Sequence, residues 1–248
     1  MAGGAEQVPA MKVLAIIPAA GAGVRMGGET PKQFLSIDGV PIVIHTLRKF
    51  NQAESIDEIY VGVRPEDMER AQAEIQREQF EKPVRLVAGG ATRQQTVALG
   101  LRKAPPGTEI VVVHDAVRPF VTPEMIHLSV EAARKSGAAI LGIPSVDTVK
   151  QVERQTILGT IPRERIVLAQ TPQAFQFEII KEACERAEAE GFEGTDEASL
   201  VEHLGGTVTV LMGSDRNIKI TKPSDLPLAR LFFAQEQELA ERRAKLPL

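Results

Sequence analysis

The chain has few of the residues that usually carry redox or metal chemistry. Its 248 residues include one Cys, one Tyr, four His and no Trp. A single cysteine, Cys184, excludes a disulfide framework within the chain and any cysteine-rich metal site. Four scattered histidines argue against a multi-histidine zinc centre. We therefore expect a chemistry that uses neither a thiol nor an imidazole, and we assign no role to Cys184.

The chain also has no excess of positive charge and no long apolar run. Lys and Arg number 29 against 33 Asp and Glu, for a net charge of −4, whereas nucleic-acid-binding proteins usually present a basic face. The first apolar run, 13–17, ends at Pro18, far short of the ~20 residues that span a bilayer. Residues 1–10 lack the basic start and apolar stretch of a signal peptide. We predict a flexible N-terminal tail and a cytoplasmic protein with no membrane or nucleic-acid partner.

Short apolar, β-branched runs alternate with amphipathic windows along most of the chain. This βαβα rhythm predicts an α/β fold with a Rossmann-like, mostly parallel twisted sheet and helices on both faces. Ligands of such a sheet bind beyond the carboxyl ends of its strands. The runs predicted as strands are 13–17, 58–63, 84–87, 109–114, 139–143, 207–211 and 217–220. The windows predicted as helices are 41–50, 65–79, 93–103, 122–135, 176–189, 196–203 and 226–246.

The alternation breaks at Pro144. Two short runs rich in Val, Ile and Thr follow, 148–152 and 156–161, with a polar tripeptide between them. They predict an extended β-arm that protrudes from the α/β domain. Because an isolated two-stranded arm is marginally stable in water, we expect it to pack on a second copy of the chain. The predicted division is 1–10 for the tail, 11–143 and 173–248 for the α/β domain, and 144–172 for the arm.

A glycine-rich turn, 18–28, follows the first predicted strand. Small residues there let backbone N–H groups approach an anion closely. The turn matches neither of two common phosphate-binding motifs, because the dinucleotide fingerprint needs Gly where Met26 stands and the P-loop needs Lys followed by Ser or Thr. Two cations follow instead, Arg25 and Lys32, and cations behind a backbone anion site suit a polyphosphate. We therefore predict a nucleotide site.

An ordered series of motifs carries a family resemblance. The motifs are Pro18-Ala19-Ala20-Gly21-x-Gly23-x-Arg25-Met26 with Pro31-Lys32-Gln33 after it, Gly89-Gly90-Ala91-Thr92-Arg93, His114-Asp115-Ala116-Val117-Arg118-Pro119, Thr171-Pro172-Gln173, Thr195-Asp196-Glu197-Ala198-Ser199 and Asn217-Ile218-Lys219-Ile220-Thr221. Together they resemble the sugar-phosphate nucleotidyltransferase family, and within it the cytidylyltransferases that act on methylerythritol phosphate. The resemblance covers roughly residues 12–230.

The resemblance implies transfer of a cytidylyl group from CTP to 2-C-methyl-D-erythritol 4-phosphate, with release of pyrophosphate, in the non-mevalonate pathway to isoprenoid precursors. It also implies Mg²⁺ or another divalent cation, and a homodimer in which the arm completes the neighbouring active site. Such a reaction needs no general base, because a phosphate nucleophile with a second pKa of ~6 is mostly dianionic at neutral pH. The protein must instead bring two anions together and stabilise the charge at the α-phosphorus.

The resemblance further implies roles for particular residues. The catalytic set is Arg25, Lys32, Asp115 and Lys219. The nucleotide-binding set is Ala19, Ala20, Gly21, Gly23, Arg25, Lys32, Gly90, Ala91, Arg93 and Thr96. The set for the polyol phosphate is Asp115, Arg118, Thr148, Arg163, Thr195 and Lys219. Mg²⁺ is expected mainly on the CTP phosphates, with Asp115 as its candidate protein ligand.

Several alternatives stay open from the sequence. A ribitol 5-phosphate cytidylyltransferase shares most of these motifs, since both substrates are small polyol phosphates. A non-catalytic nucleotide-binding module on the same fold is more remote, because the charged residues of the catalytic set are intact. Among single residues, Thr92 could serve only as a helix N-cap. Arg163 could serve only as a surface partner of Glu164 or Glu153.

Overall fold

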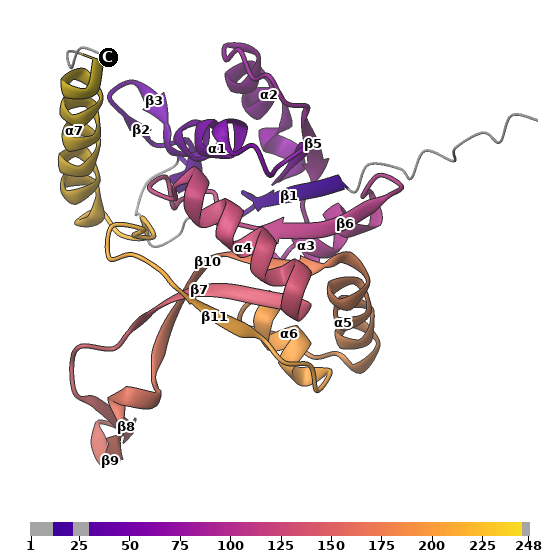
Figure 1. Ribbon diagram of the computed structural model, residues 1–248, viewed down its shortest axis with the longest axis vertical. Helices are drawn as coiled ribbons and strands as arrows, with labels where there is room; N and C mark the ends of the chain where they lie inside the picture. Colours follow the sequence, from indigo (N-terminus) through magenta and orange to yellow (C-terminus); the bar gives the residue numbers. More distant parts are fainter. Residues whose placement is uncertain (1–11, 22–29, 245–248) are drawn as a thin grey trace, which may run out of the picture.

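A seven-stranded sheet lies at the centre of the computed structural model, which describes residues 12–21 and 30–244. The sheet has the order β11-β7-β10-β6-β1-β4-β5 (Figure 1). Its strands are β1 (Lys12–Pro18), β4 (Glu58–Val63), β5 (Val84–Ala88), β6 (Thr108–Val113), β7 (Ala138–Pro144), β10 (Val167–Gln176) and β11 (Thr209–Met212). β10 is antiparallel to β6 and β7, and the other pairings are parallel. The predicted α/β fold with a mostly parallel sheet is therefore confirmed.

Helices cover both faces of the sheet. The helices are α1 (Ile42–Gln52), α2 (Met68–Gln76), α3 (Arg93–Arg102), α4 (Pro123–Ser136), α5 (Phe177–Glu190), α6 (Glu197–His203) and α7 (Asp225–Ala244). Successive side chains of a strand point to opposite faces, so Ala15 and Ile17 pack with α1, α2 and α4, while Leu14 and Ile16 pack with α3, α5 and α6. Burial on both faces explains why β1 is apolar throughout rather than alternating.

Three of the helices begin at local signals in the sequence. The hydroxyls of Thr92 and Thr122 each accept a hydrogen bond from the backbone N–H three residues later, at the starts of α3 and α4. Asp196 and Ser199 form a capping box at the start of α6. The N-cap role that the sequence left open for Thr92 is therefore confirmed. It also means that the loops before these helices have a defined shape.

β10 was not predicted as a strand. It pairs with β7 from Val167, which lies opposite Pro144, so residues 167–172 belong to the central sheet and the protruding segment is shorter than 144–172. The ladder shifts register between Gln170 and Gln173. A proline within a run argues against a strand, and Pro172 sits at this irregularity. The local sequence therefore does not predict β10, which is stabilised by pairing with β6 and β7.

The predicted strand at 217–220 is wrong, because these residues form a bend followed by a loop without regular secondary structure. Asn217 is fully buried, and its amide Nδ2 donates to the backbone oxygen of Thr171 at 2.8 Å. The backbone N–H of Ile220 donates to the oxygen of Val117 at 2.9 Å. These isolated hydrogen bonds fix the loop without a strand ladder, and they hold Lys219 at the carboxyl edge of the sheet.

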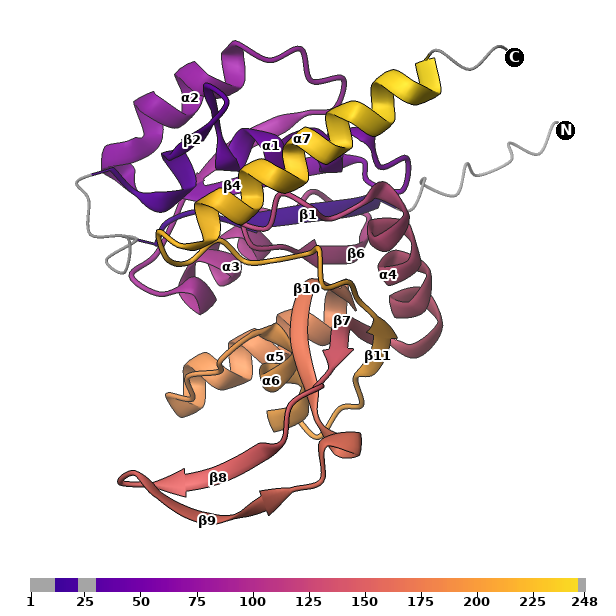
Figure 2. The ribbon, with the colours of Figure 1, turned by 90° about the vertical axis from the view of Figure 1, so that its left-hand side faces the viewer.

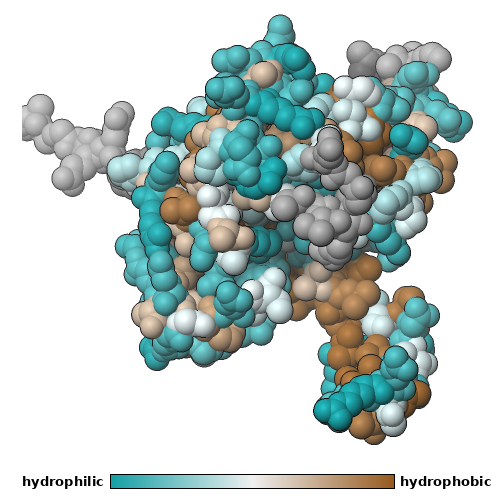
Figure 3. All heavy atoms as spheres, turned by 180° about the vertical axis from the view of Figure 1, so that it is seen from behind, coloured by the Kyte–Doolittle hydropathy of each residue, from teal (hydrophilic) through white to brown (hydrophobic). Residues whose placement is uncertain are grey.

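The β-arm consists of β8 (Val149–Glu153) and β9 (Thr156–Ile161), which form a separate antiparallel sheet. Figures 1 and 2 show it projecting away from the helices and the central sheet. Apolar side chains are exposed on the arm and at its base (Figure 3). They are Val146, Val152, Ile157, Leu158, Val167, Leu168, Val210 and Met212. This surface has the composition of one that another molecule covers.

A small hairpin and the last helix pack together in an apolar cluster of their own. The hairpin is β2 (Ser36–Ile37) with β3 (Val40–Pro41), and it packs with α7 around Ile37, Phe120, Ile220 and Phe233. This cluster anchors the loop that carries Lys219. No helix in the described part of the chain, the 20-residue α7 included, combines the length and apolarity needed to cross a membrane.

Candidate functional site

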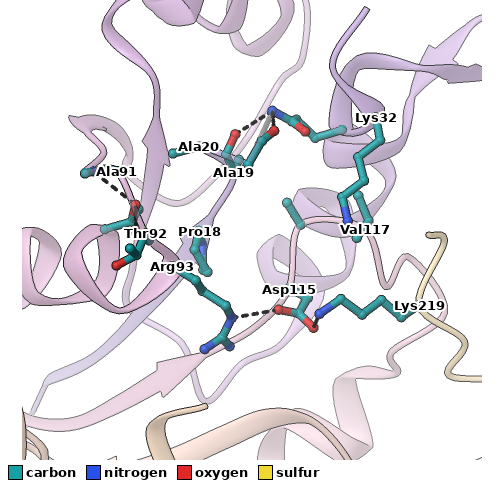
Figure 4. Close-up of a pocket in the computed structure, with 15 residues that line it drawn as sticks. Pro18, Ala19, Ala20, Lys32, Ala91, Thr92, Arg93, Asp115, Val117 and Lys219 are labelled. Carbon is teal, nitrogen blue, oxygen red and sulfur yellow. Dashed lines mark hydrogen bonds and ion pairs between the residues drawn. The ribbon is translucent and has the colours of Figure 1, made fainter. Parts of the chain in front are cut away.

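A cavity of about 210 Å³ opens at the carboxyl edge of the sheet, beside the loops that follow β1, β5 and β6 (Figure 4). The predicted nucleotide-binding residues that line it are Ala19, Ala20, Gly21, Lys32, Gly90, Ala91, Arg93 and Thr96. Asp115 and Lys219, predicted as catalytic, line it too. A second hollow of about 190 Å³ shares Arg93, Asp115 and Lys219 with the first and adds Arg118 and Thr195. Because the two hollows share Arg93, Asp115 and Lys219, ligands bound in them would meet at these three side chains.

Lys32 reaches the cavity from the short 3₁₀ helix Lys32–Phe34. Figure 4 shows its side chain extending toward Asp115 and Lys219 from across the cavity. The neighbouring Gln33 is buried, and its amide donates to the backbone oxygens of Ala19 at 2.6 Å and Gly21 at 3.2 Å. Gln33 therefore holds the end of β1 against the cavity. Sequence reasoning missed this role, although Gln33 stood within a quoted motif.

Two residues of the predicted site, Gly23 and Arg25, lie outside the described residues. Their predicted roles at the phosphates stay predictions.

The loop between β5 and α3 owes its shape to close packing. A Cβ on Gly89 would lie 2.5 Å from the Cβ of Ala20, so only glycine fits there. The Thr96 hydroxyl donates to the Thr92 backbone oxygen at 2.9 Å and accepts from the Gly90 N–H at 3.1 Å. Thr96 is 1% exposed although it lines the cavity, and both of these hydrogen bonds of its hydroxyl stay within the loop and its helix.

Asp115 organises three cations at the junction of the two hollows. Its Oδ1 accepts from Arg93 Nε at 3.0 Å, and its Oδ2 lies 2.8 Å from Lys219 Nζ (Figure 4). The same Oδ2 lies 3.4 Å from Arg118 Nε. Burial raises the pKa of this carboxyl, but Arg93 and Lys219 outweigh burial and hold it well below its usual range. Asp115 is therefore ionised at neutral pH and keeps mutually repelling cations together.

Arg93 is held on its other side by a carboxylate that the sequence analysis did not assign to the site. Glu197, at the start of α6, lies with Oε2 2.5 Å from Arg93 Nη1 and is 1% exposed. Burial disfavours the charge of Arg93, but Glu197 and Asp115 outweigh burial and raise the pKa of the guanidinium. Burial also raises the pKa of Glu197, and Arg93 opposes that shift. The only sequence signal was an acidic residue inside a quoted motif.

His114 lies behind Asp115 and is fully buried. Its Nε2 is 3.0 Å from the backbone oxygen of Arg118, which can only accept, so Nε2 carries the proton. Nδ1 then accepts from the Thr171 hydroxyl at 3.0 Å, and that hydroxyl accepts from the Asp115 N–H at 3.1 Å. A neutral imidazole therefore ties the loop that carries Asp115 to β10.

Burial of His114 should make stability depend on pH. Burial lowers the pKa of His114 from 6.5 to about 4, and the charges that face it belong to Asp115, Arg118 and Arg93. Between these pH values the unfolded chain binds one more proton than the folded chain. The free energy of unfolding should therefore fall as the pH falls from 6.5 towards 4, by up to about 3 kcal/mol.

Urea unfolding of the wild type and of His114→Gln, from about pH 7 to about pH 5, measures this contribution. The variant should be less stable at neutral pH, but it should lose less stability on acidification. Equal losses in the two proteins would show that other groups account for the pH dependence.

Thr148 and Arg163 line neither hollow, because both lie on or beside the arm. Arg163 donates from Nη1 to the backbone oxygen of Val146 at 2.8 Å, and its Nε is 3.8 Å from Glu164 Oε1. Within one chain, Arg163 therefore forms the surface pair that the sequence left open. Contact with a substrate would require the active site of another subunit.

Neither hollow is lined by Cys or His among the described residues. Cys184 is buried in α5, and burial raises the pKa of its thiol to about 12. It therefore carries no thiolate at neutral pH. The charged side chains that line the hollows are those of Lys32, Arg93, Arg118, Lys219, Asp115 and Asp196.

The donors fit a divalent cation that is bound together with a nucleotide. Mg²⁺ is usually held by one or two carboxylates, with substrate phosphates and water as the other ligands. Asp115 is the carboxylate that lines both hollows, and no cluster of three or more His, Cys, Asp or Glu in the described residues could hold a metal alone. Coordination by Asp115 would require one of its ion pairs to open.

Comparison with known proteins identifies relatives over nearly the whole chain. The sequence profile of 2-C-methyl-D-erythritol 4-phosphate cytidylyltransferase matches residues 13–235. The proteins of that name from Acidobacterium capsulatum and Solibacter usitatus are 52% and 47% identical to this chain. Each alignment covers 91% of this chain, and 98% and 97% of the respective relative.

Solved structures agree with the sequence comparison. The 4-diphosphocytidyl-2C-methyl-D-erythritol synthase of Anaerococcus prevotii superimposes with a TM-score of 0.80 at 31% identity. The 2-C-methyl-D-erythritol 4-phosphate cytidylyltransferase of Thermus thermophilus superimposes with a TM-score of 0.74 at 35% identity. Each match covers 90% of this chain and 98% of the solved one.

Proposed function

The chain belongs to the 2-C-methyl-D-erythritol 4-phosphate cytidylyltransferase family, and we propose that it transfers the cytidylyl group of CTP to 2-C-methyl-D-erythritol 4-phosphate. It is a nucleotidyltransferase of the non-mevalonate route to isoprenoid precursors. One observation in the structure carries the proposal: Lys32, Arg93 and Lys219 line one cavity around the buried Asp115. Such a cavity suits two polyanions that must meet.

In the proposed reaction, a phosphate oxygen of the polyol phosphate attacks the α-phosphorus of CTP. A new P–O bond forms, the bond to the β-phosphate oxygen breaks, and pyrophosphate leaves with that electron pair. The attacking phosphate has a second pKa of ~6 and is mostly dianionic at neutral pH, so no side chain has to remove a proton. The protein lowers the barrier by positioning the two anions and stabilising charge in the transition state.

We assign the two hollows to the two substrates. The larger one takes CTP, with Lys32 at the triphosphate and the backbone of 19–21 and 90–91 at the nucleotide. The smaller one takes the polyol phosphate, since it adds Arg118 and Thr195 to the shared residues. Lys219 lines both hollows, which supports its assignment to the reacting phosphates. Arg25 is proposed to join Lys32 at the triphosphate.

A divalent cation such as Mg²⁺, bound mainly through the CTP phosphates with Asp115 as its candidate protein ligand, would neutralise further phosphate charge. The side chains of Lys32, Arg93 and Lys219 supply the rest of the positive charge at the cavity. This division suits a site in which cations outnumber carboxylates.

We propose that the arm joins two chains in a homodimer and completes the neighbouring active site. The exposed apolar residues on the arm and at its base support a contact with another subunit. In the dimer, Thr148 and Arg163 of the partner subunit would contact the phosphate of the polyol, for which an arginine fork is well suited. Location in the cytoplasm stays a prediction.

The proposal predicts a specific requirement for substrates. The purified protein should release pyrophosphate from CTP only when 2-C-methyl-D-erythritol 4-phosphate and Mg²⁺ are both present. A coupled pyrophosphate assay with 2-C-methyl-D-erythritol 4-phosphate or ribitol 5-phosphate as the acceptor measures this. Equal or faster turnover of ribitol 5-phosphate would change the substrate assignment, and binding of CTP without turnover of either acceptor would indicate a non-catalytic module.

A further inference from the structure

Glu197 lies against the cation cluster without lining either hollow. It is 1% exposed, and among the described residues it forms an ion pair only with Arg93, 104 residues earlier in the chain. A carboxylate loses hydration energy when it is buried, and a single arginine often does not repay that loss in stability. A contribution to stability therefore does not explain why a carboxylate is buried at this position.

The backbone around Glu197 is fixed independently of Arg93. The buried Gln173 of β10 donates from Nε2 to Asp196 Oδ2 at 2.7 Å, and its Oε1 accepts from the Ala198 N–H at 3.2 Å. Asp196 also forms the capping box with Ser199 that begins α6. The start of α6 is therefore attached to the central sheet on both sides of Glu197. These hydrogen bonds fix the backbone position from which the Glu197 side chain reaches Arg93.

Arg93 is oriented by two carboxylates at once. Its Nε donates to Asp115 and its Nη1 donates to Glu197. Because the guanidinium is planar and its donors form a rigid fork, two hydrogen bonds from different nitrogens determine the plane of the group. The remaining nitrogen, Nη2, has no hydrogen bond to a described residue, and Arg93 lines both hollows. A donor is thus available where the two substrates would meet.

We propose that Glu197 is a positioning residue for the transfer reaction: it holds the Arg93 guanidinium at the junction of the two hollows and does not itself contact substrate. This inference rests on the proposed function. Without Glu197, Arg93 would keep only its bond to Asp115 and could rotate about it. Glu197 also offsets one of the positive charges gathered around Asp115, so that the cations can stay close before substrates bind.

The test compares Glu197→Gln with Glu202→Gln, a matched control that removes the same charge from the exposed side of the same helix. Glu197→Gln should lower kcat/KM by about 10–100-fold, by analogy with the loss found when the hydrogen-bond partner of a metal ligand is removed. Glu202→Gln should leave kcat/KM unchanged. Glu197→Asp, which keeps the charge on a shorter side chain, should recover part of the loss and serves if Glu197→Gln folds poorly.

Two further measurements separate positioning from a structural role. If Glu197 acts through Arg93, Arg93→Lys with Glu197→Gln should be no less active than Arg93→Lys alone. The NMR signal of the Arg93 Nη1–H group, which donates to Glu197, should be protected from solvent exchange in the wild type and lose that protection in Glu197→Gln. Both effects are specific to Arg93, whereas a loss of stability would affect the whole domain.

The outcomes are distinct. A folded Glu197→Gln variant with the kcat/KM of Glu202→Gln and a protected Arg93 signal would overturn the inference, as would fully additive effects of the two substitutions. If the wild type does not turn over CTP with 2-C-methyl-D-erythritol 4-phosphate, the proposed function fails. In that case the Arg93 signal alone decides whether Glu197 positions this side chain.

Discussion

Replacing Asp115 with Asn is expected to lower kcat/KM by about 10³-fold. Losing one charge contact to a transition state costs about 10²–10³-fold, and three cations depend on Asp115 for their positions. Removal of one member of a buried ion pair also destabilises a protein by about 3–5 kcal/mol. We expect a value near 3 kcal/mol, because the side chain of Lys219 is 35% exposed and water screens part of its charge.

Glu58→Gln is the matched control for Asp115→Asn. Glu58 is also a buried carboxylate paired with an arginine, Arg85, but it lies at the start of β4, on the opposite edge of the sheet. Its loss should reduce the free energy of unfolding and leave kcat/KM unchanged. Steady-state kinetics and urea unfolding of both variants provide the comparison. An Asp115→Asn variant with near-normal kcat/KM would remove Asp115 from the catalytic set.

Subunits carrying Lys219→Ala should regain activity when mixed with subunits carrying Arg163→Ala. Alone, Lys219→Ala should lower kcat by at least ~10²-fold, since a charge at the reacting phosphates is lost, and Arg163→Ala should weaken binding of the polyol phosphate. If each site combines Lys219 of one chain with Arg163 of the partner subunit, a mixed dimer has one intact site. Random mixing should then restore about a quarter of wild-type activity.

Lys222→Ala is the control for this experiment, because Lys222 is exposed three residues after Lys219. It should be fully active alone and should not depend on mixing. Size-exclusion chromatography with differently tagged chains shows whether mixed dimers form. Mixed dimers without recovered activity would mean that Arg163 acts within its own chain or not at all. A monomeric protein would contradict the proposed dimer itself.

Much of the fold could be predicted because its signals are local. The apolar runs of β1, β4 and β6 mark strands that are buried on both faces, and Thr92 and Thr122 mark helix starts. The two errors have the opposite cause. β10 contains Pro172 and becomes a strand through pairing with β6 and β7. Residues 217–220 look like a strand but are held in a loop by hydrogen bonds from Asn217 and Ile220.

The candidate site, like the fold, could be predicted only where local sequence motifs mark its residues. Lys32, Asp115 and Lys219 stood in recognisable motifs, and the structure brings them to one cavity. Gln33 and Glu197 could not be assigned, because their roles depend on Ala19 and Arg93, which lie 14 and 104 residues away. Nothing in the sequence around Glu197 indicates that its side chain is buried against an arginine.

By itself the sequence determined that the chain has few Cys and His residues for catalysis, that its strands and helices alternate, and that cations follow several strand ends. Those properties depend on composition, periodicity and caps, which act over a few residues. Only the tertiary structure decided that Arg93, Arg118 and Lys219 share Asp115, and that a buried Glu197 fixes Arg93 from the other side. Electrostatic pairing depends on distance and burial, and both are set when distant segments of the chain meet.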